Sequence, residues 1–415
     1  MMDALPIELV DLVFSFLDDD KLTLSNCTLL NRHFHEISRT RLFHKITIFS
    51  SLSAVHTVAA FCRYLASGCE ESKRAQPLIK VLRVANKSLS GPITPTSSYE
   101  LGYILQHLPA LQDLELCNIS LLATAGCPIP GWNFDSYRPK SLRRVEIDGV
   151  CFELQDGQED TAVCSLTQLF DLFGTVETLH ILTIRPLLWG DEEPQAIAKL
   201  VKAAGQSIST TFKVQKLIAS PRPFTSLLAI QILGGSPRSL SDVQSLDIRE
   251  ELLVSVDKDL RPVRKSLKHL HLRIVASSLI EDTRPYTFSS YSQLSSLTLT
   301  VIIIQYQSEC DSAASTMACA MEAILDIPPS LSELFINFRC VYREQPRSIL
   351  NCLDDGERWD DVDEMLTKHP ALQSVLIQFE DIQRSGAKAL QADIESISKR
   401  LSRLNASRKL TVTQK

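Results

Sequence analysis

The sequence lacks the short motifs that mark the commonest enzyme and cofactor sites. It contains no nucleophile elbow of the form G-x-S-x-G, no phosphate-binding G-x-x-x-x-G-K-[ST], no dinucleotide-binding G-x-G-x-x-G and no zinc-binding H-E-x-x-H. Glycine is scarce, with 14 in 415 residues, which argues against a loop that cradles a cofactor. We therefore predict that the protein is not an enzyme, with no catalytic residue, cofactor or metal ligand. An enzyme whose residues meet only in the folded chain is the alternative that the sequence leaves open.

Long apolar runs and signals of secretion are missing as well. The longest aliphatic run is Val301 to Ile304, whereas a membrane-spanning helix needs about 20 apolar residues. The N-terminal residues carry no basic region ahead of an apolar stretch. The 11 cysteines form an odd set without a C-x-x-C pair, which is typical of reduced, buried thiols. We expect a protein of the cytoplasm, the nucleus or both, with no membrane partner.

Basic clusters are also absent. The chain has 43 Lys and Arg against 49 Asp and Glu, and the net charge of −6 comes from residues of both signs mixed along the sequence. A nucleic-acid-binding surface needs a basic stripe that neutralises phosphates, so we predict no nucleic-acid partner. The chain is rich in hydrophobic residues, which make up 44% of the sequence and are enough for a large core.

The first apolar pattern predicts a helix near the N-terminus. Apolar residues recur at helical spacing at Leu9, Val13, Phe16 and Leu17, and Pro6 suits a first helical turn. The acidic run from Asp18 to Asp20 closes the segment.

A second short helix is expected to begin near Thr23. It places Leu24, Cys27 and Leu30 on one stripe, and Phe34 follows. Two helices in about forty residues cannot cover all these apolar faces internally. The pattern therefore indicates a helical docking module that needs a partner.

These residues resemble the F-box, whose pattern runs Leu-Pro-x-Glu-Leu, an aliphatic-aromatic pair before a Leu, an acidic turn, and Val-Cys-Arg-x-Trp. The matching positions are Leu5, Pro6, Glu8, Leu9, Val13, Phe14, Leu17, Leu22 and the block from Leu30 to Phe34. In that block Asn31 stands where the pattern has Cys, and Phe34 where it has Trp. The resemblance covers residues 1–48.

The resemblance to the F-box implies binding to the Skp-type adaptor of a cullin-RING (SCF) ubiquitin ligase. The side chains it assigns to this contact are Leu5, Pro6, Leu9, Val13, Leu17, Leu22 and Leu24. An ordinary N-terminal helical cap with a chance Leu-Pro start is the alternative.

From residue 49 to 415 the chain repeats one phrase: an apolar residue, two variable residues, Leu or a close equivalent, one variable residue and another apolar residue. Copies begin at Ile79, Leu111, Leu142, Val176, Val214, Val243, Leu267, Leu294, Leu331 and Leu372. Amphipathic helical stretches lie between them. The phrase resembles a divergent leucine-rich repeat, which implies an α/β solenoid with a parallel sheet on the concave side and helices on the convex side. A doubly wound α/β domain is the competing architecture, but it does not need the same phrase so often.

Alternation along each strand then selects the residues of the exposed concave face. If Leu114 and Leu116 face the core, their neighbours face outward. The residues predicted in this way to contact a protein target are Asp113, Glu115, Arg144, Glu146, Asp148, His180, Asp247, Arg249, His269, His271 and Arg273. The two histidines share one face of a strand, but no further ligand stands at a recognisable spacing, so we predict a solvent-facing pair and no metal site.

An acidic segment between Asp354 and Glu364 carries seven carboxylates. We expect these side chains to be solvated and to favour the start of the helix that contains Trp359. A metal or a basic partner is the alternative for this segment.

Together these patterns predict a substrate-recognition subunit of an SCF-type ubiquitin ligase. The N-terminal module would bind the Skp-type adaptor and, through it, the cullin-RING scaffold, while the repeats hold a protein substrate whose identity the sequence does not give. The alternative is a leucine-rich-repeat interaction scaffold outside any ubiquitin ligase.

Overall fold

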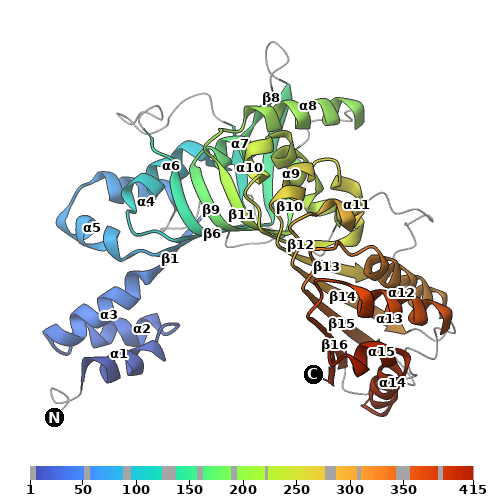
Figure 1. Cartoon of the computed structure of the whole chain (residues 1–415). Helices are drawn as coiled ribbons and strands as arrows, with labels where there is room; N and C mark the ends of the chain where they lie inside the picture. Colours follow the sequence, from blue (N-terminus) through green and yellow to red (C-terminus); the bar gives the residue numbers. More distant parts are fainter. Residues whose placement is uncertain are drawn as a thin grey trace. The chain divides into compact units, whose positions relative to one another are not determined.

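The computed structural model is an α/β protein with a large parallel β-sheet (Figure 1). The structure describes residues 6–50, 57–86, 95–123, 137–156, 162–187, 194–219, 223–275, 287–305, 310–342, 356–381 and 387–414. Contacts divide the chain into a first unit, Met1–Glu177 with Thr183–Leu200, and a second unit, Thr178–Leu182 with Val201–Lys415. Leu5 lies outside the described residues.

The first unit begins with three helices, α1 (Ile7–Ser15), α2 (Lys21–Cys27) and α3 (Arg32–His44) (Figure 1). The Asp20 carboxylate caps α2 by accepting a hydrogen bond of 3.0 Å from the backbone N–H of Thr23. The Asn31 side chain caps α3 by accepting one of 2.8 Å from the N–H of Phe34. The expectation that one helix carries Leu24, Cys27 and Leu30 is therefore wrong, because α2 ends at Cys27 and Asn31 starts a new helix.

The main-sheet strands of the first unit pair in parallel and follow the order of the sequence. They are β1 (Lys45–Phe49), β2 (Val81–Ala85), β4 (Asp113–Cys117) and β6 (Lys140–Asp148), and β9 (Phe173–Ile181), which contains the boundary between the units, follows β6. The helical segments between them are α4 (Val58–Ala66), α5 (Glu70–Ala75), η2 (Gln76–Leu78), α6 (Ser98–His107) and α7 (Ser165–Phe170).

A second, smaller sheet in the first unit was not predicted from the sequence. Its order is β10 (Ile184–Leu187), β7 (Val150–Asp156), β5 (Ser120–Leu122) and β3 (Pro95–Ser97), and β8 (Ala162–Cys164) pairs antiparallel with β7. The chain passes from β4 to β5 and from β6 to β7 through a residue in the left-handed conformation, Asn118 with φ 53° and Gly149 with φ 65°. Asn and Gly adopt this conformation at the lowest cost.

The second unit continues the alternation of strands and helices. Its strands pair in parallel in sequence order as β11 (Lys213–Ala219), β12 (Ser245–Arg249), β13 (His269–Val275), β14 (Ser296–Gln305), β15 (Glu333–Tyr342), β16 (Ser374–Asp381) and β17 (Leu410–Gln414). The α-helices between and beside them are α9 (Pro223–Gly235), α10 (Pro237–Leu240), α11 (Glu250–Val256), α12 (Cys310–Leu325), α13 (Gly356–Lys368), α14 (Ala387–Arg400) and α15 (Ser402–Ala406). Two short 3-10 helices are η4 (Arg261–Lys265) and η5 (Phe288–Ser290), and α8 (Pro194–Ser207) crosses the unit boundary.

The repeated phrase forms the strands of this sheet, as predicted. Its two inner apolar positions align across neighbouring strands, as Leu246 does with Leu270 and Leu270 with Leu297, and all three are at most 2% exposed. Its first position, such as Leu267 or Leu294, lies two residues before the strand and is fully buried. Each such side chain contributes about 1.5–3 kcal/mol by leaving water, so the phrase repeats because every strand adds to one core.

Within the residues described above, no helix has the length and apolar composition needed to cross a membrane.

Candidate functional site

Helix α1 carries two apolar stripes, and only one of them is buried. Val10 and Phe14, which lie four residues apart, are 5% and 6% exposed. The neighbouring stripe of Leu9, Val13 and Phe16 is 47%, 57% and 81% exposed. An isolated surface helix of a globular protein normally has one apolar stripe, so the second one requires an explanation.

The buried stripe forms the internal core of the three helices. Val10, Phe14, Leu24 and Phe34 pack together, and the rings of Phe14 and Phe34 lie 5.5 Å apart between centroids. Leu17 packs partly buried against the same cluster. The assignment of Leu24 to an outer contact is wrong, because its side chain is completely buried inside the module.

The exposed apolar side chains of this region form what we call the N-terminal apolar surface: Leu9, Leu12, Val13, Phe16, Leu22, Leu29 and Leu30. They are seven of the eight exposed large hydrophobic side chains found among the described residues. The predicted contact residues Leu9, Val13 and Leu22 belong to this set, and Pro6 is also exposed. Leu12 and Leu29 are not among the predicted contact residues, although Leu12 and Phe16 are spaced as i and i+4. So many exposed large apolar side chains within residues 9–30 are typical of an interaction surface.

Arg41 on α3 holds α1 in place beside this surface. Its guanidinium donates hydrogen bonds of 2.7 Å to the carboxylates of Asp11 and Asp18 and one of 2.8 Å to the backbone carbonyl of Asp11. Burial alone would lower the pKa of Arg41, but the bonds to these two carboxylates raise it above its ordinary value. The Arg41 side chain, only 16% exposed, thus joins two segments of the module in one geometry.

The outward face of the sheet in the first unit is occupied by ion pairs. The carboxylate of Glu115 accepts hydrogen bonds of 2.8 and 3.1 Å from the ammonium of Lys45 and lies 3.8 Å from Arg83. Arg143 binds the carboxylate of Asp113 in a bidentate manner, at 3.0 and 2.5 Å. Asp113 is therefore 8% exposed, and its predicted position on an open surface is wrong, because the guanidinium of Arg143 covers it.

Further along the same face, Arg144 on β6 forms an ion pair with Glu146. Asp148 on β6 is half-buried. Cys117 on β4 also points outward by strand alternation but is 8% exposed, and burial raises the pKa of its thiol. The accessible polar groups of this face are therefore fewer than alternation alone predicts.

In the second unit the predicted residues of β12 and β13 form one network. Asp247 lies 3.2 Å from Nδ1 of His271, whose Nε2 is 2.8 Å from the hydroxyl of Thr300, and Arg273 binds the same carboxylate. Burial alone would raise the pKa of Asp247, but the hydrogen bond to His271 and the charges of His271 and Arg273 lower it below its ordinary value. The prediction of two solvent-facing histidines is confirmed for His269, which is exposed. The side chain of His271 is also partly open to solvent, at 35% exposed, but it is held in this network.

Two further predicted target residues are not part of this network. Arg249 on β12 forms an ion pair of 2.8 Å with Glu251, and His180 on β9 is half-buried. The structure thus brings Asp247, His271 and Arg273 together.

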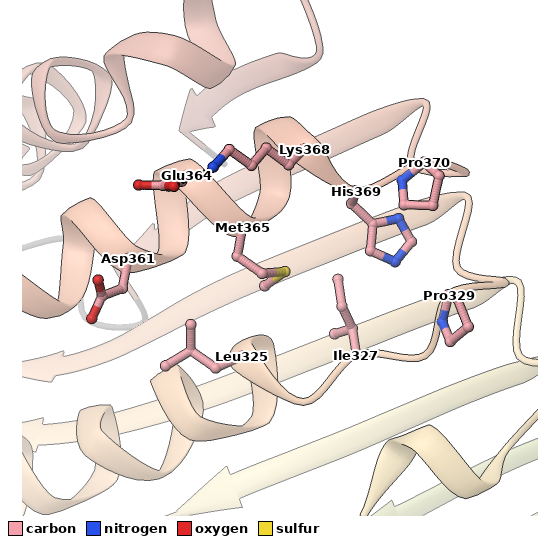
Figure 2. Close-up of a pocket in the computed structure, with 9 residues that line it drawn as sticks. All are labelled: Leu325, Ile327, Pro329, Asp361, Glu364, Met365, Lys368, His369 and Pro370. Atoms are coloured by element: carbon pink, nitrogen blue, oxygen red, sulfur yellow. Dashed lines mark hydrogen bonds and ion pairs between the residues drawn. The ribbon is translucent and has the colours of Figure 1, made fainter.

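A groove of about 700 Å³ lies on the helical side of the second unit, between α13 and the segment that joins α12 to β15 (Figure 2). Its lining is Leu325, Ile327, Pro329, Asp361, Glu364, Met365, Lys368, His369 and Pro370. Nε2 of His369 lies 3.0 Å from the carbonyl oxygen of Pro328, and Lys368 forms an ion pair with Glu364. Among the described residues, this lining includes no Ser, Thr or Cys that a base would activate.

The acidic segment next to this groove only partly follows its prediction. Asp360, Asp361 and Glu364 are exposed on α13 as expected. Asp363 is 3% exposed, and its carboxylate accepts hydrogen bonds of 2.9 Å from the backbone N–H groups of Arg403 and Leu404 at the start of α15. The prediction of solvated side chains is wrong for Asp363, which joins α13 to α15.

No group of three or more His, Cys, Asp or Glu side chains among the described residues is arranged to hold a metal ion. Comparison with protein-family models gives no match to this sequence, and a search of curated proteins finds no relative.

Proposed function

We propose that this protein is the substrate-recognition subunit of an SCF-type ubiquitin ligase. In this proposal the three N-terminal helices act as an F-box that binds a Skp-type adaptor, and the strand-helix body acts as a divergent leucine-rich-repeat solenoid that holds a protein substrate. The observation that carries the proposal is the N-terminal apolar surface, which concentrates seven exposed large apolar side chains between Leu9 and Leu30. Four of the residues assigned to adaptor binding, Pro6, Leu9, Val13 and Leu22, are exposed.

The size of this surface fits a stable protein contact. Covering a Leu, Val or Phe side chain contributes about 1.5–3 kcal/mol, so four of them contribute about 6–12 kcal/mol before the costs of association. The Arg41 ion pairs reduce those costs, because they hold α1 and α3 in position before a partner arrives.

The role requires no catalytic residue on this chain. A bound substrate has its lysines held close to a ubiquitin-conjugating enzyme, which raises their effective concentration at the reacting group. The proposal therefore agrees with the absence of enzyme motifs from the sequence.

The test uses the purified full chain and a purified Skp-type adaptor in gel filtration. We expect a one-to-one complex with the wild type and its loss with Phe16→Ala/Leu22→Ala, because these two side chains belong to the proposed contact surface. Both are exposed, so their replacement should leave the fold intact. The matched control is Glu36→Ala/Thr40→Ala, two exposed positions on α3, which should retain the complex. Undiminished adaptor binding by Phe16→Ala/Leu22→Ala would count against the proposal.

The second candidate is a repeat scaffold outside any ligase, in which the N-terminal helices only cap the body. It is favoured if the folded wild-type chain forms no complex with the adaptor. In the ligase proposal the substrate contacts the outward face of the sheet. Proximity labelling with and without a proteasome inhibitor then identifies substrates, because proteins that the ligase marks for degradation should be enriched more strongly when the proteasome is blocked.

A further inference from the structure

The last strand of the second unit leaves one edge of the sheet without a partner among the described residues. β17 (Leu410–Gln414) stands at the end of the strand order and pairs only with β16. The opposite end strand, β1, differs, because Thr57 forms a bridge with Phe49 beside it. An uncovered strand edge presents a row of backbone donors and acceptors to which another strand can pair.

The register identifies which backbone groups face outward. The N–H of Val375 on β16 donates to the carbonyl of Lys409 at 2.8 Å, and Val375 is aligned with Leu410. In a parallel ladder the backbone groups of alternate residues point to the same neighbour, so those of Lys409, Thr411 and Thr413 point to β16. The N–H and C=O groups of Leu410, Val412 and Gln414 therefore point away from the sheet.

The side chains of β17 suit an added strand on both faces. Leu410 and Val412 are aligned with the buried Val375 and Ile377, so they lie on the core side, while Thr411 and Thr413 lie on the outward face. The strand contains no Pro and no charged residue, the features by which many proteins protect an edge from pairing.

The sequence segment that contains this edge is basic. Residues 399–415 contain six Lys and Arg and no Asp or Glu, although the whole chain has a net charge of −6. Arg403 is paired with Glu364 at 3.2 Å. Arg408 and Lys409, which directly precede the strand, form no ion pair with the other described residues, and Arg408 is exposed.

We propose that β17 is a docking edge that accepts an extended acidic peptide segment of a partner protein by strand addition. The outward groups of Leu410, Val412 and Gln414 supply the backbone pairing, as in other complexes in which a peptide extends a sheet. Arg408 and Lys409 select carboxylates beside the pairing segment. This site is separate from the proposed function and does not depend on it.

The experiment measures binding of a fluorescein-labelled peptide, Glu-Glu-Val-Thr-Val-Thr-Val-Glu-Glu, to the full chain by anisotropy. We expect saturable binding that Val412→Pro weakens about tenfold or more, because Pro removes an outward N–H and leaves the bonds to β16 intact. Lys409→Glu should weaken binding about threefold or more at low salt. Lys265→Glu, at an exposed position on η4, is the matched control and should bind as the wild type does.

Hydrogen exchange identifies the mode of binding and checks the fold of Val412→Pro. In the free chain the amides of Thr411 and Thr413 should be protected and those of Leu410, Val412 and Gln414 should exchange fast, and peptide should protect all five. If Val412→Pro loses protection at Thr411 and Thr413, the variant has lost its fold at this strand and a modified peptide is used in its place. The same peptide, methylated on alternate amide nitrogens, should bind the wild-type chain about tenfold more weakly than the unmethylated peptide does.

Three results would overturn the proposal. They are the absence of saturable binding, binding that neither Val412→Pro nor the methylated peptide weakens, and a wild-type dimer that Val412→Pro converts to monomer, since a second copy of the chain would then occupy the edge.

Discussion

Two leucines of helix α2 allow the stability of the three N-terminal helices to be tested separately from binding through the N-terminal apolar surface. Leu24 is completely buried against Val10, Phe14 and Phe34, whereas Leu22, two residues earlier on the same helix, is 74% exposed. Replacing each by Ala removes the same atoms from opposite environments. We expect Leu24→Ala to unfold or loosen the module, and Leu22→Ala to leave it intact.

The magnitude follows from the burial of each side chain. A buried Leu→Ala change costs about 2–5 kcal/mol, because the transfer free energy of the lost atoms and the cavity both contribute. The same change at an exposed position costs less than about 0.5 kcal/mol. A helical module of this size has little stability to spare, so the larger loss should be visible as local opening.

Hydrogen exchange followed by mass spectrometry measures this directly on peptides that cover α1, α2 and α3. The opening free energy of these helices should fall by about 2–5 kcal/mol in Leu24→Ala and stay within about 0.5 kcal/mol in Leu22→Ala. Adaptor binding should be lost in both variants, in one through unfolding and in the other through the missing contact. Equal protection in the two variants would refute the assignment of Leu24 to the core.

Three further predictions concern the body of the protein. Gly149→Ala should lower the thermal midpoint more than Gly68→Ala. Both glycines have a positive φ, a conformation that costs an L-residue about 1–2 kcal/mol. At Gly149 the new Cβ would also lie 2.1 Å from Oδ1 of Asn118, whereas at Gly68 it would meet nothing within 4 Å. Asp363→Ala should cost about 1–3 kcal/mol and expose the α15 amides to hydrogen exchange, since two backbone N–H groups lose their acceptor. The hydrogen bond to His271 and the charges of His271 and Arg273 lower the pKa of Asp247 in the folded protein. The ionised carboxylate therefore stabilises the fold at pH values above the unfolded pKa of about 3.9. This stabilisation is lost as the pH falls through the lower pKa of the folded protein. Asp247→Asn should therefore lower the urea midpoint at pH 7, and the difference from the wild type should shrink as the pH falls below the ordinary pKa of an Asp carboxyl.

The strands were predictable because each copy of the phrase contributes to one continuous core. All ten predicted copies from Ile79 to Leu372 correspond to strands of the main sheet. The smaller sheet was not predictable in this way, since strands as short as β5 (Ser120–Leu122) give no period to detect.

The outward residues were harder to predict than the strands. Alternation places Asp113 on the outward face, but it does not show that the long side chain of Arg143 covers it. Likewise, Leu22 and Leu24 have the same residue type and lie on the same helix, and only the packing of Phe14 and Phe34 decides which of them is buried. These features depend on contacts between residues about 10–30 positions apart, which local periodicity does not contain.

The pairing of each strand with the next one along the sequence has a consequence for how the second unit can change over evolution. Removing or duplicating one complete helix-strand segment leaves all other strand pairs from β11 to β17 as they were. Each such step would lengthen or shorten the outward face of the sheet by about 4.8 Å, the spacing between neighbouring strands. Gene rearrangement could thus adjust the reach of this face in fixed increments without redesigning its core.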